Sequence, residues 1–136
     1  MHILLAKPAS IPNVIAFFKE NLNPDSSEIY SEEFLCPLGT QAAIRRNQMI
    51  LAIENGHVVG AIRFYRRKTA NTISLYQFAV SSKYRGKGVL KKMLLFINDA
   101  PIVALCPIES KFNQYYYKMD WKLQEQVDGF NTWIFK

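Results

Sequence analysis

The stretch from Ile73 to Leu95 places the tightest constraint on the fold, because it joins two kinds of secondary structure through glycines. Its first half, ISLYQFAV, is apolar and rich in β-prone residues, which predicts a buried strand. Its second half, VLKKMLLFIN, carries apolar side chains at helical spacing, namely Leu90, Met93, Leu94 and Ile97. Any fold for this chain must therefore contain a strand that turns directly into an amphipathic helix.

The turn between the two halves, Lys83-Tyr84-Arg85-Gly86-Lys87-Gly88, has the composition of an anion-binding site. Free backbone N–H groups at a helix N-terminus and the positive end of the helix dipole point at the same spot. The glycines let the backbone come close to a phosphate, and Lys83, Arg85 and Lys87 add positive charge. The pattern is neither a Walker A loop nor a Gly-x-Gly-x-x-Gly dinucleotide fingerprint. On glycine spacing alone, an ordinary turn with solvated lysines explains it equally well.

Length and composition predict one globular domain, residues 1–136. Apolar residues make up 49% of the 136 residues and charged residues 21%. No apolar run reaches the length of a membrane span and no signal peptide is present, so we expect no membrane partner and a cytoplasmic location by default. Cys36 and Cys106, like His2 and His57, lack the spacing of metal ligands, so we expect no metal site.

The positive charge is concentrated in one part of the chain. The formal net charge is +6, but residues 61–92 hold nine basic residues and no acidic one. This excess on the glycine turn and on the strands before it favours a polyanionic partner. Nucleic acid and a phosphorylated cofactor both qualify, and a solvated basic face is the alternative.

The hydrophobic patterns predict an α/β fold with a mixed sheet, in the order β-α-α-β-β-β-α-β-α-β-β. Asn55-Gly56 and Asp128-Gly129 predict two tight hairpins. The strand after the glycine-turn helix, Ala100–Cys106, is expected to lie parallel to Thr72–Val80 through a right-handed crossover. The other expected strands are His2–Ala6, Met49–Ile53, His57–Arg67, Trp121–Val127 and Phe130–Phe135.

Capping residues predict where the helices begin. Ser10 is expected to cap the first helix. A helix begun at residues 25–27 is expected to be interrupted at residues 37–39, after which Thr40 caps a further short helix. Asn113 is expected to cap a short helix before the last hairpin.

This order of elements, with the glycine turn after the fourth strand, resembles the GNAT-type N-acetyltransferase family over essentially the whole chain. That family holds the pyrophosphate of acetyl-coenzyme A in a Gln/Arg-x-x-Gly-x-Gly/Ala turn. Arg85-x-x-Gly88-x-Leu90 matches this pattern except at the last, small position. Lys83-x-x-Gly86-x-Gly88 matches it with lysine in the first position.

A second stretch carries the resemblance independently. The family follows its fifth strand with an Asn and then with Phe-Tyr-x-Lys-x-Gly-Phe. Here Asn113 precedes Tyr115-Tyr116-Tyr117-Lys118-Met119-Asp120-Trp121, in which Asp120 and Trp121 replace Gly-Phe. An aromatic helical turn that packs on the core would explain part of this pattern, but two motifs in the family's order argue against a chance resemblance.

The resemblance implies transfer of an acetyl group from acetyl-coenzyme A to a primary amine, with the fourth and fifth strands splayed apart. Lys83 and Arg85 would add charge beside the pyrophosphate, and Asn113 would bond the pantetheine arm. Tyr116 would protonate the departing thiolate, since a neutral tyrosine hydroxyl can donate. The residues whose main-chain groups it assigns to the pantetheine arm and the pyrophosphate are Phe78, Ala79, Val80, Gly86, Lys87, Gly88 and Val89.

The general base and the acceptor stay open at this point. The strand Ile73–Val80 has no acidic residue, Glu54 and Glu109 are surface candidates, and a water chain serves equally well, so no base is assigned. The acidic residues at 25–33 either solvate a helix start or attract a cationic acceptor. A small-molecule amine and a protein lysine or N-terminus both fit.

Two other functions compete with the enzyme. The first is a domain that binds an acyl-coenzyme A without catalysis, because Leu90 and the missing base depart from the family pattern. The second is a basic nucleic-acid binder that uses residues 63–68 and 83–92, which ranks lower because no RNA-recognition, zinc-finger or helix-turn-helix signature supports it. The chain is expected to be a monomer, or a homodimer through the edge of its last hairpin.

Overall fold

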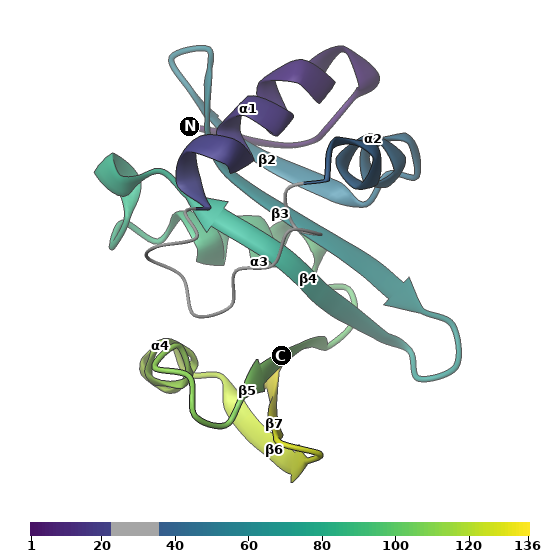
Figure 1. The fold of residues 1–136 in the computed structure, drawn as a ribbon, viewed down its shortest axis with the longest axis vertical. Helices are drawn as coiled ribbons and strands as arrows, with labels where there is room; N and C mark the ends of the chain where they lie inside the picture. The colour runs from purple at the N-terminus through teal and green to yellow at the C-terminus, as the bar shows by residue number, and fades with distance from the viewer. Residues whose placement is uncertain (23–35) are drawn as a thin grey trace.

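The computed structural model describes residues 1–22 and 36–136 (Figure 1). Strands and helices follow the predicted order. The strands are β1 (His2–Leu5), β2 (Met49–Glu54), β3 (His57–Arg67), β4 (Thr72–Val80), β5 (Ile102–Pro107), β6 (Lys122–Val127) and β7 (Phe130–Phe135). The α-helices are α1 (Ile11–Asn21), α2 (Pro37–Arg45), α3 (Val89–Ile97) and α4 (Asn113–Lys118), and the short 3-10 turns are η1 (Pro8–Ser10) and η3 (Ser82–Tyr84).

The seven strands form one mixed sheet in the order β1-β2-β3-β4-β5-β7-β6. Among the described strands, β4 and β5 form the one parallel pair, which confirms the predicted parallel arrangement. Both predicted hairpins are present: φ is 51° at Asn55, 77° at Gly56, 54° at Asp128 and 83° at Gly129. Positive φ at both central residues is what the type I′ turn requires, and the local sequence supplies residues that tolerate it.

Helices cover both faces of the sheet. α1 and α2 pack on one face of β2, β3 and β4, and α3 packs on the other (Figure 1). The buried face of α3 holds Val89, Leu90, Met93, Leu94 and Ile97, each 6% exposed or less. Since burial of one such side chain contributes about 1.5–3 kcal/mol, this face anchors α3, and with it the glycine turn, by roughly 10 kcal/mol.

Two predicted helix starts differ from the structure, and a third agrees in position but lacks the predicted capping bond. Pro37 begins α2 instead of interrupting a helix, because the missing N–H of proline is harmless in a first turn. Thr40 therefore lies inside α2, where it is buried. Ser10 occupies the cap position of α1 but makes no side-chain cap bond, and α4 starts at Asn113 itself. The predicted helix start at residues 25–27 lies outside the described residues.

Within residues 1–22 and 36–136, no helix has both the length and the apolar content needed to cross a membrane. In the same residues, no three His, Cys, Asp or Glu side chains gather into a group that could hold a metal ion.

Candidate active site

The glycine turn ends β4 and starts α3 with two left-handed residues. Gly86 has φ 76°, and Gly88, at the cap position of α3, has φ 77° and ψ 16°. A Cβ added at either glycine would meet no heavy atom within 4 Å, so the need for glycine is conformational and the space beside the turn is open. No side chain caps α3, which leaves its first N–H groups available to an anion.

The three basic side chains of the turn are exposed. Arg85 donates from Nε to the carbonyl oxygen of Val80 at 3.0 Å, which ties the turn to the end of β4. The Nζ atom of Lys87 lies 5.5 Å from the ring centre of Tyr84. Together with Lys83, these side chains give the turn before the uncapped start of α3 three positive charges.

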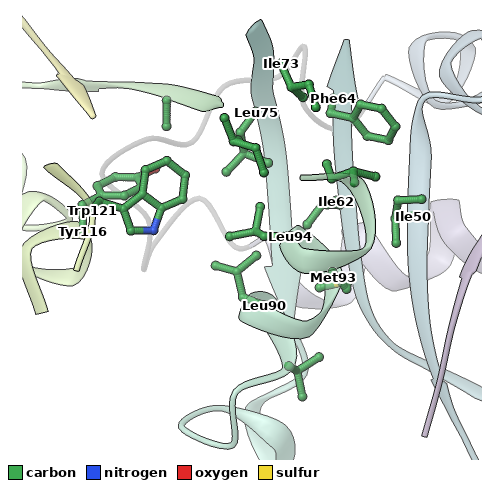
Figure 2. Packing of buried hydrophobic residues seen from close by; sticks show 14 of the residues in the cluster. Ile50, Ile62, Phe64, Ile73, Leu75, Leu90, Met93, Leu94, Tyr116 and Trp121 are labelled. Atoms are coloured by element: carbon green, nitrogen blue, oxygen red, sulfur yellow. The ribbon is translucent and has the colours of Figure 1, made fainter. Parts of the chain in front are cut away.

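Leu90 does not lie on the open side of the turn, although it replaces the small residue of the family pattern. It is 6% exposed and belongs to the core cluster with Met93 and Leu94. Figure 2 shows these three side chains projecting from α3 into the hydrophobic core. The large side chain of Leu90, which departs from the family pattern, is therefore accommodated in the hydrophobic core.

A bulge in β4 separates the two halves of this strand. Arg63 of β3 pairs with Gln77, but the next residue, Phe64, pairs with Leu75, so Tyr76 is an extra residue in β4. Before the bulge Leu75 faces α3, and after it Ala79 packs with α1 and α2. The bulge thus reverses which face each later side chain of β4 meets.

The parallel pairing of β4 with β5 ends almost where it begins. The paired residues are Ile73 with Ile102 and Ser74 with Val103. Beyond them β5 runs away from β4 toward α4 and the last hairpin (Figure 1), which confirms the predicted splay. The edge of β4 from Leu75 to Val80 is therefore not paired with β5, and this separation of the two strands is here called the opening.

Main-chain groups of β4 alternate between β3 and the opening. Ser81 N–H donates to Val59 on β3 at 2.9 Å. Alternation along a strand then directs Ala79 toward β3, and Phe78 and Val80 toward the opening. Because Val80 O already accepts from Arg85, Phe78 carries the main-chain groups nearest the bulge that stay unpaired within residues 1–22 and 36–136.

The three consecutive tyrosines of α4 occupy three different environments. Tyr116 is 3% exposed, and its ring lies 5.0 Å from that of Trp121 and 5.7 Å from that of Trp133. Tyr115 is half-buried, with its ring 6.3 Å from that of Phe78 on the opposite wall of the opening. Tyr117 is 76% exposed. The predicted acid, Tyr116, is thus the most buried of the three.

Burial controls the acidity of two of these hydroxyls. It raises the pKa of Tyr115 to about 12. It raises the pKa of Tyr116 further, with smaller contributions from Cys106 and Tyr115. Both side chains are neutral at physiological pH. An ordinary thiol has a pKa of about 8.5, well below the pKa of either tyrosine. Each hydroxyl is therefore better suited to donate a hydrogen bond to a thiolate than to transfer its proton completely.

The side-chain amide of Asn113 joins the segment after β5 to β7. Its Nδ2 atom donates to the carbonyl oxygens of Pro107 and Ser110, both at 2.8 Å, and of Ile108 at 3.1 Å. Its Oδ1 atom accepts from Asn131 Nδ2 at 2.9 Å and from Trp133 Nε1 at 2.8 Å. These bonds use every donor and acceptor that the amide has. A bond to the pantetheine arm would have to displace one of them, and it stays a prediction.

The two carboxylates considered as bases lie away from the opening or in solvent. Glu54 Oε2 is 3.4 Å from the amino group of Met1, beside a surface hollow of ≈ 730 Å³ between α1, the β2–β3 hairpin and η3. Glu109 is exposed in the segment after β5. Among the described residues, neither the opening nor β4 gains a carboxylate.

One pair beside the opening was not found from the sequence. The Arg63 guanidinium carbon lies 4.5 Å from the ring centre of Tyr76, the bulged residue. The Nη1 atom of Arg63 lies 3.2 Å from where a Cβ on Gly39 of α2 would stand. No sequence pattern joins residues on three elements, so the pair depends on register and on the bulge.

Comparison with protein families decides the relationship. Residues 15–99, from α1 to the end of α3, match the model of the acetyltransferase (GNAT) family. The chain belongs to the GNAT acetyltransferase family. The match includes β4, the bulge and the glycine turn, so the resemblance expected from the sequence is confirmed.

Solved GNAT structures share the fold along the whole chain. PaiA N-acetyltransferase from Thermoplasma acidophilum, in complex with coenzyme A, has a TM-score of 0.78 at 17% identity, over 99% of this chain and 98% of its own. The yncA protein from Salmonella typhimurium, with acetyl-CoA, has a TM-score of 0.73 at 15% identity, over 100% and 93%. Diaminobutyrate acetyltransferase EctA from Paenibacillus lautus has 0.68 at 15%, over 98% and 92%. No curated protein sequence matches the chain significantly.

Proposed function

We propose that this GNAT protein transfers an acetyl group from acetyl-coenzyme A to a primary amine. The observation that carries the proposal is the combination of an opening between β4 and β5 with an uncapped, glycine-lined start of α3 at the end of β4. Coenzyme A complexes of similar folds support the same donor. The residues fit the group, because the space beside Gly86 and Gly88 is open and the turn is basic.

The binding roles follow from these positions. Main-chain N–H groups of residues 86–89 hold the pyrophosphate, with Lys83 and Arg85 beside it. Phe78 and Val80 present main-chain groups to the pantetheine arm, as a neighbouring strand would. When bound, acetyl-coenzyme A supplies an activated acyl group as a thioester. The N–H of Phe78 lies on the side where it can stabilise the developing oxyanion.

Two tyrosines compete for the role of hydroxyl donor to the thiolate. The family motif assigns it to Tyr116. The packing of Tyr115 on Phe78 favours Tyr115 as the alternative. No carboxylate of the described residues serves as base, so a water chain that carries the ammonium proton to solvent is the arrangement we favour.

The three tyrosines provide their own matched controls. Each is replaced by Phe, and thiol release from acetyl-coenzyme A is measured with a panel of primary amines, alongside cofactor affinity by calorimetry. Loss of the donor hydroxyl should lower kcat by about 10²-fold or more at unchanged cofactor affinity, and Tyr117→Phe should have no effect. Unaltered turnover in both Tyr115→Phe and Tyr116→Phe would remove tyrosine from the mechanism.

The same measurements separate the competing functions. Tight cofactor binding without turnover on any amine would favour the non-catalytic acyl-coenzyme A-binding domain. Absence of cofactor binding up to millimolar concentration, with binding to nucleic acid that weakens steeply with salt, would favour the nucleic-acid binder. The acceptor is a small-molecule amine or a protein amine. The acidic residues that suggested a cationic acceptor, at positions 25–33, lie outside the described residues.

A further inference from the structure

We infer that Arg63, held by Tyr76, binds a carboxylate group of the amine acceptor. The inference rests on the proposed function and names the acceptor class: a primary amine that also carries a carboxylate. It follows from the position of Arg63, from the Tyr76 ring that holds its guanidinium, and from the absence of a carboxylate partner for Arg63 among the described residues.

Arg63 lies on the face of the sheet that the acceptor must use. Its neighbours along β3, Ile62 and Phe64, pack toward α3, so alternation directs Arg63 to the face of α1 and α2. The position of its guanidinium, 3.2 Å from where a Cβ on Gly39 of α2 would stand, agrees. On the opposite face stand α3 with the glycine turn and α4 with Tyr115, where the donor is expected. An acceptor therefore approaches the opening from the side of Arg63.

Arg63 is also close to the reaction centre. Its register partner is Gln77, the residue before Phe78, so Arg63 stands one strand away from the proposed oxyanion donor. Neighbouring strands lie about 4.8 Å apart. Tyr76, the bulged residue of β4, brings its ring under the guanidinium at 4.5 Å. Such stacking fixes the guanidinium plane and leaves its edge, with the N–H donors, for a ligand.

The charge of Arg63 has no carboxylate partner within residues 1–22 and 36–136. The ion pairs there join Met1 to Glu54 and Arg66 to Asp99. Arg63 is half-buried, whereas Arg66 and Arg67 on the same strand are exposed. A half-buried guanidinium is costly without an anion, and a carboxylate matches its fork with two parallel hydrogen bonds.

The test compares amines that differ by one carboxylate. β-Alanine is paired with ethylamine, L-ornithine with putrescine, and L-lysine with cadaverine. Each is titrated by calorimetry into full-length protein saturated with coenzyme A. We expect at least one carboxylate-bearing member to bind tenfold or more tighter than its partner, and this preference to disappear in Arg63→Gln. Arg67→Gln, on the same strand, should keep it.

Each outcome has a defined meaning. Equal binding within every pair, no binding by any carboxylate-bearing amine, or a preference that survives Arg63→Gln overturns the inference while the proposed function stands. Lack of coenzyme A binding by the wild-type protein overturns the proposed function, and the inference falls with it. Arg63→Gln should bind coenzyme A as wild type does, which shows that the variant is folded.

Discussion

Replacement of Gly88 by alanine separates two reasons for a glycine at the start of α3. One reason is conformational, because Gly88 has φ 77° and an L-residue is strained there. The other belongs to the proposed function, in which the pyrophosphate of coenzyme A approaches the backbone where a Cβ on Gly88 would stand. A Cβ at Gly88 meets no protein atom within 4 Å, so a steric cost in the free protein is not expected.

The conformational cost alone is measured by the same substitution at a second glycine with a similar φ. Gly129, in the β6–β7 hairpin, has φ 83°, and its added Cβ also meets nothing within 4 Å. Gly88→Ala and Gly129→Ala should therefore each lose about 1–2 kcal/mol of unfolding free energy, or roughly 3–8 °C in Tm. Only Gly88→Ala should also lose cofactor affinity. One or two lost charge-assisted hydrogen bonds correspond to a loss of about 10- to 100-fold or more.

The assay is calorimetric titration of acetyl-coenzyme A into both variants and the wild type, with Tm from thermal unfolding. Micromolar binding by the wild type and by Gly129→Ala, with loss in Gly88→Ala, would place the pyrophosphate at the turn. If Gly88→Ala binds as tightly as Gly129→Ala while both lose the same stability, the glycine serves only the turn, and the reasoning about the cofactor site is refuted.

Three further predictions concern stability. Asn113→Ala should cost about 2–3 kcal/mol in urea unfolding, because buried partners lose their bonds, and a cost below about 0.5 kcal/mol would mean that the amide is dispensable. Since burial raises the pKa of Tyr115 to about 12, the unfolded state releases this proton first, so stability should be level below about pH 10 and fall up to pH 12. Tyr115→Phe should reduce that fall, measured by urea midpoints, whereas Tyr117→Phe should reproduce the wild-type curve. Gly60→Ala would place a Cβ 3.0 Å from Val89 Cγ1 and should cost about 1–3 kcal/mol in thermal unfolding, and an unchanged Tm would show that α3 moves freely.

Features that depend on a few neighbouring residues were predictable. The two hairpins follow from Asn-Gly and Asp-Gly, because these residues tolerate positive φ whatever lies around them. The amphipathic face of α3 follows from residue spacing, and the turn before it from Gly86 and Gly88. The prediction was wrong at Pro37 and Thr40. Proline can either end a helix or begin one, and threonine can either cap a helix or lie inside one, so the residues themselves did not decide where α2 begins.

Features of the candidate site that join distant residues were not predictable in the same way. Leu90 departs from the small residue of the family pattern, yet the packing of α3 on the sheet buries it. Asn113 was expected to be a helix cap, but β7 brings Asn131 and Trp133 to its side chain. Which of Tyr115, Tyr116 and Tyr117 is the most buried could not be predicted, because three adjacent residues of one type give no local pattern that distinguishes them.

The sequence by itself determined the order of the elements, the two hairpins and the basic glycine turn at the start of α3, because periodicity and φ preference act within a few residues. Only the tertiary structure decided the bulge at Tyr76, the early end of β4–β5 pairing and the position of Arg63 beside them. These depend on strand register, which is set by the packing of two hydrophobic clusters on opposite faces of the sheet rather than by any local pattern.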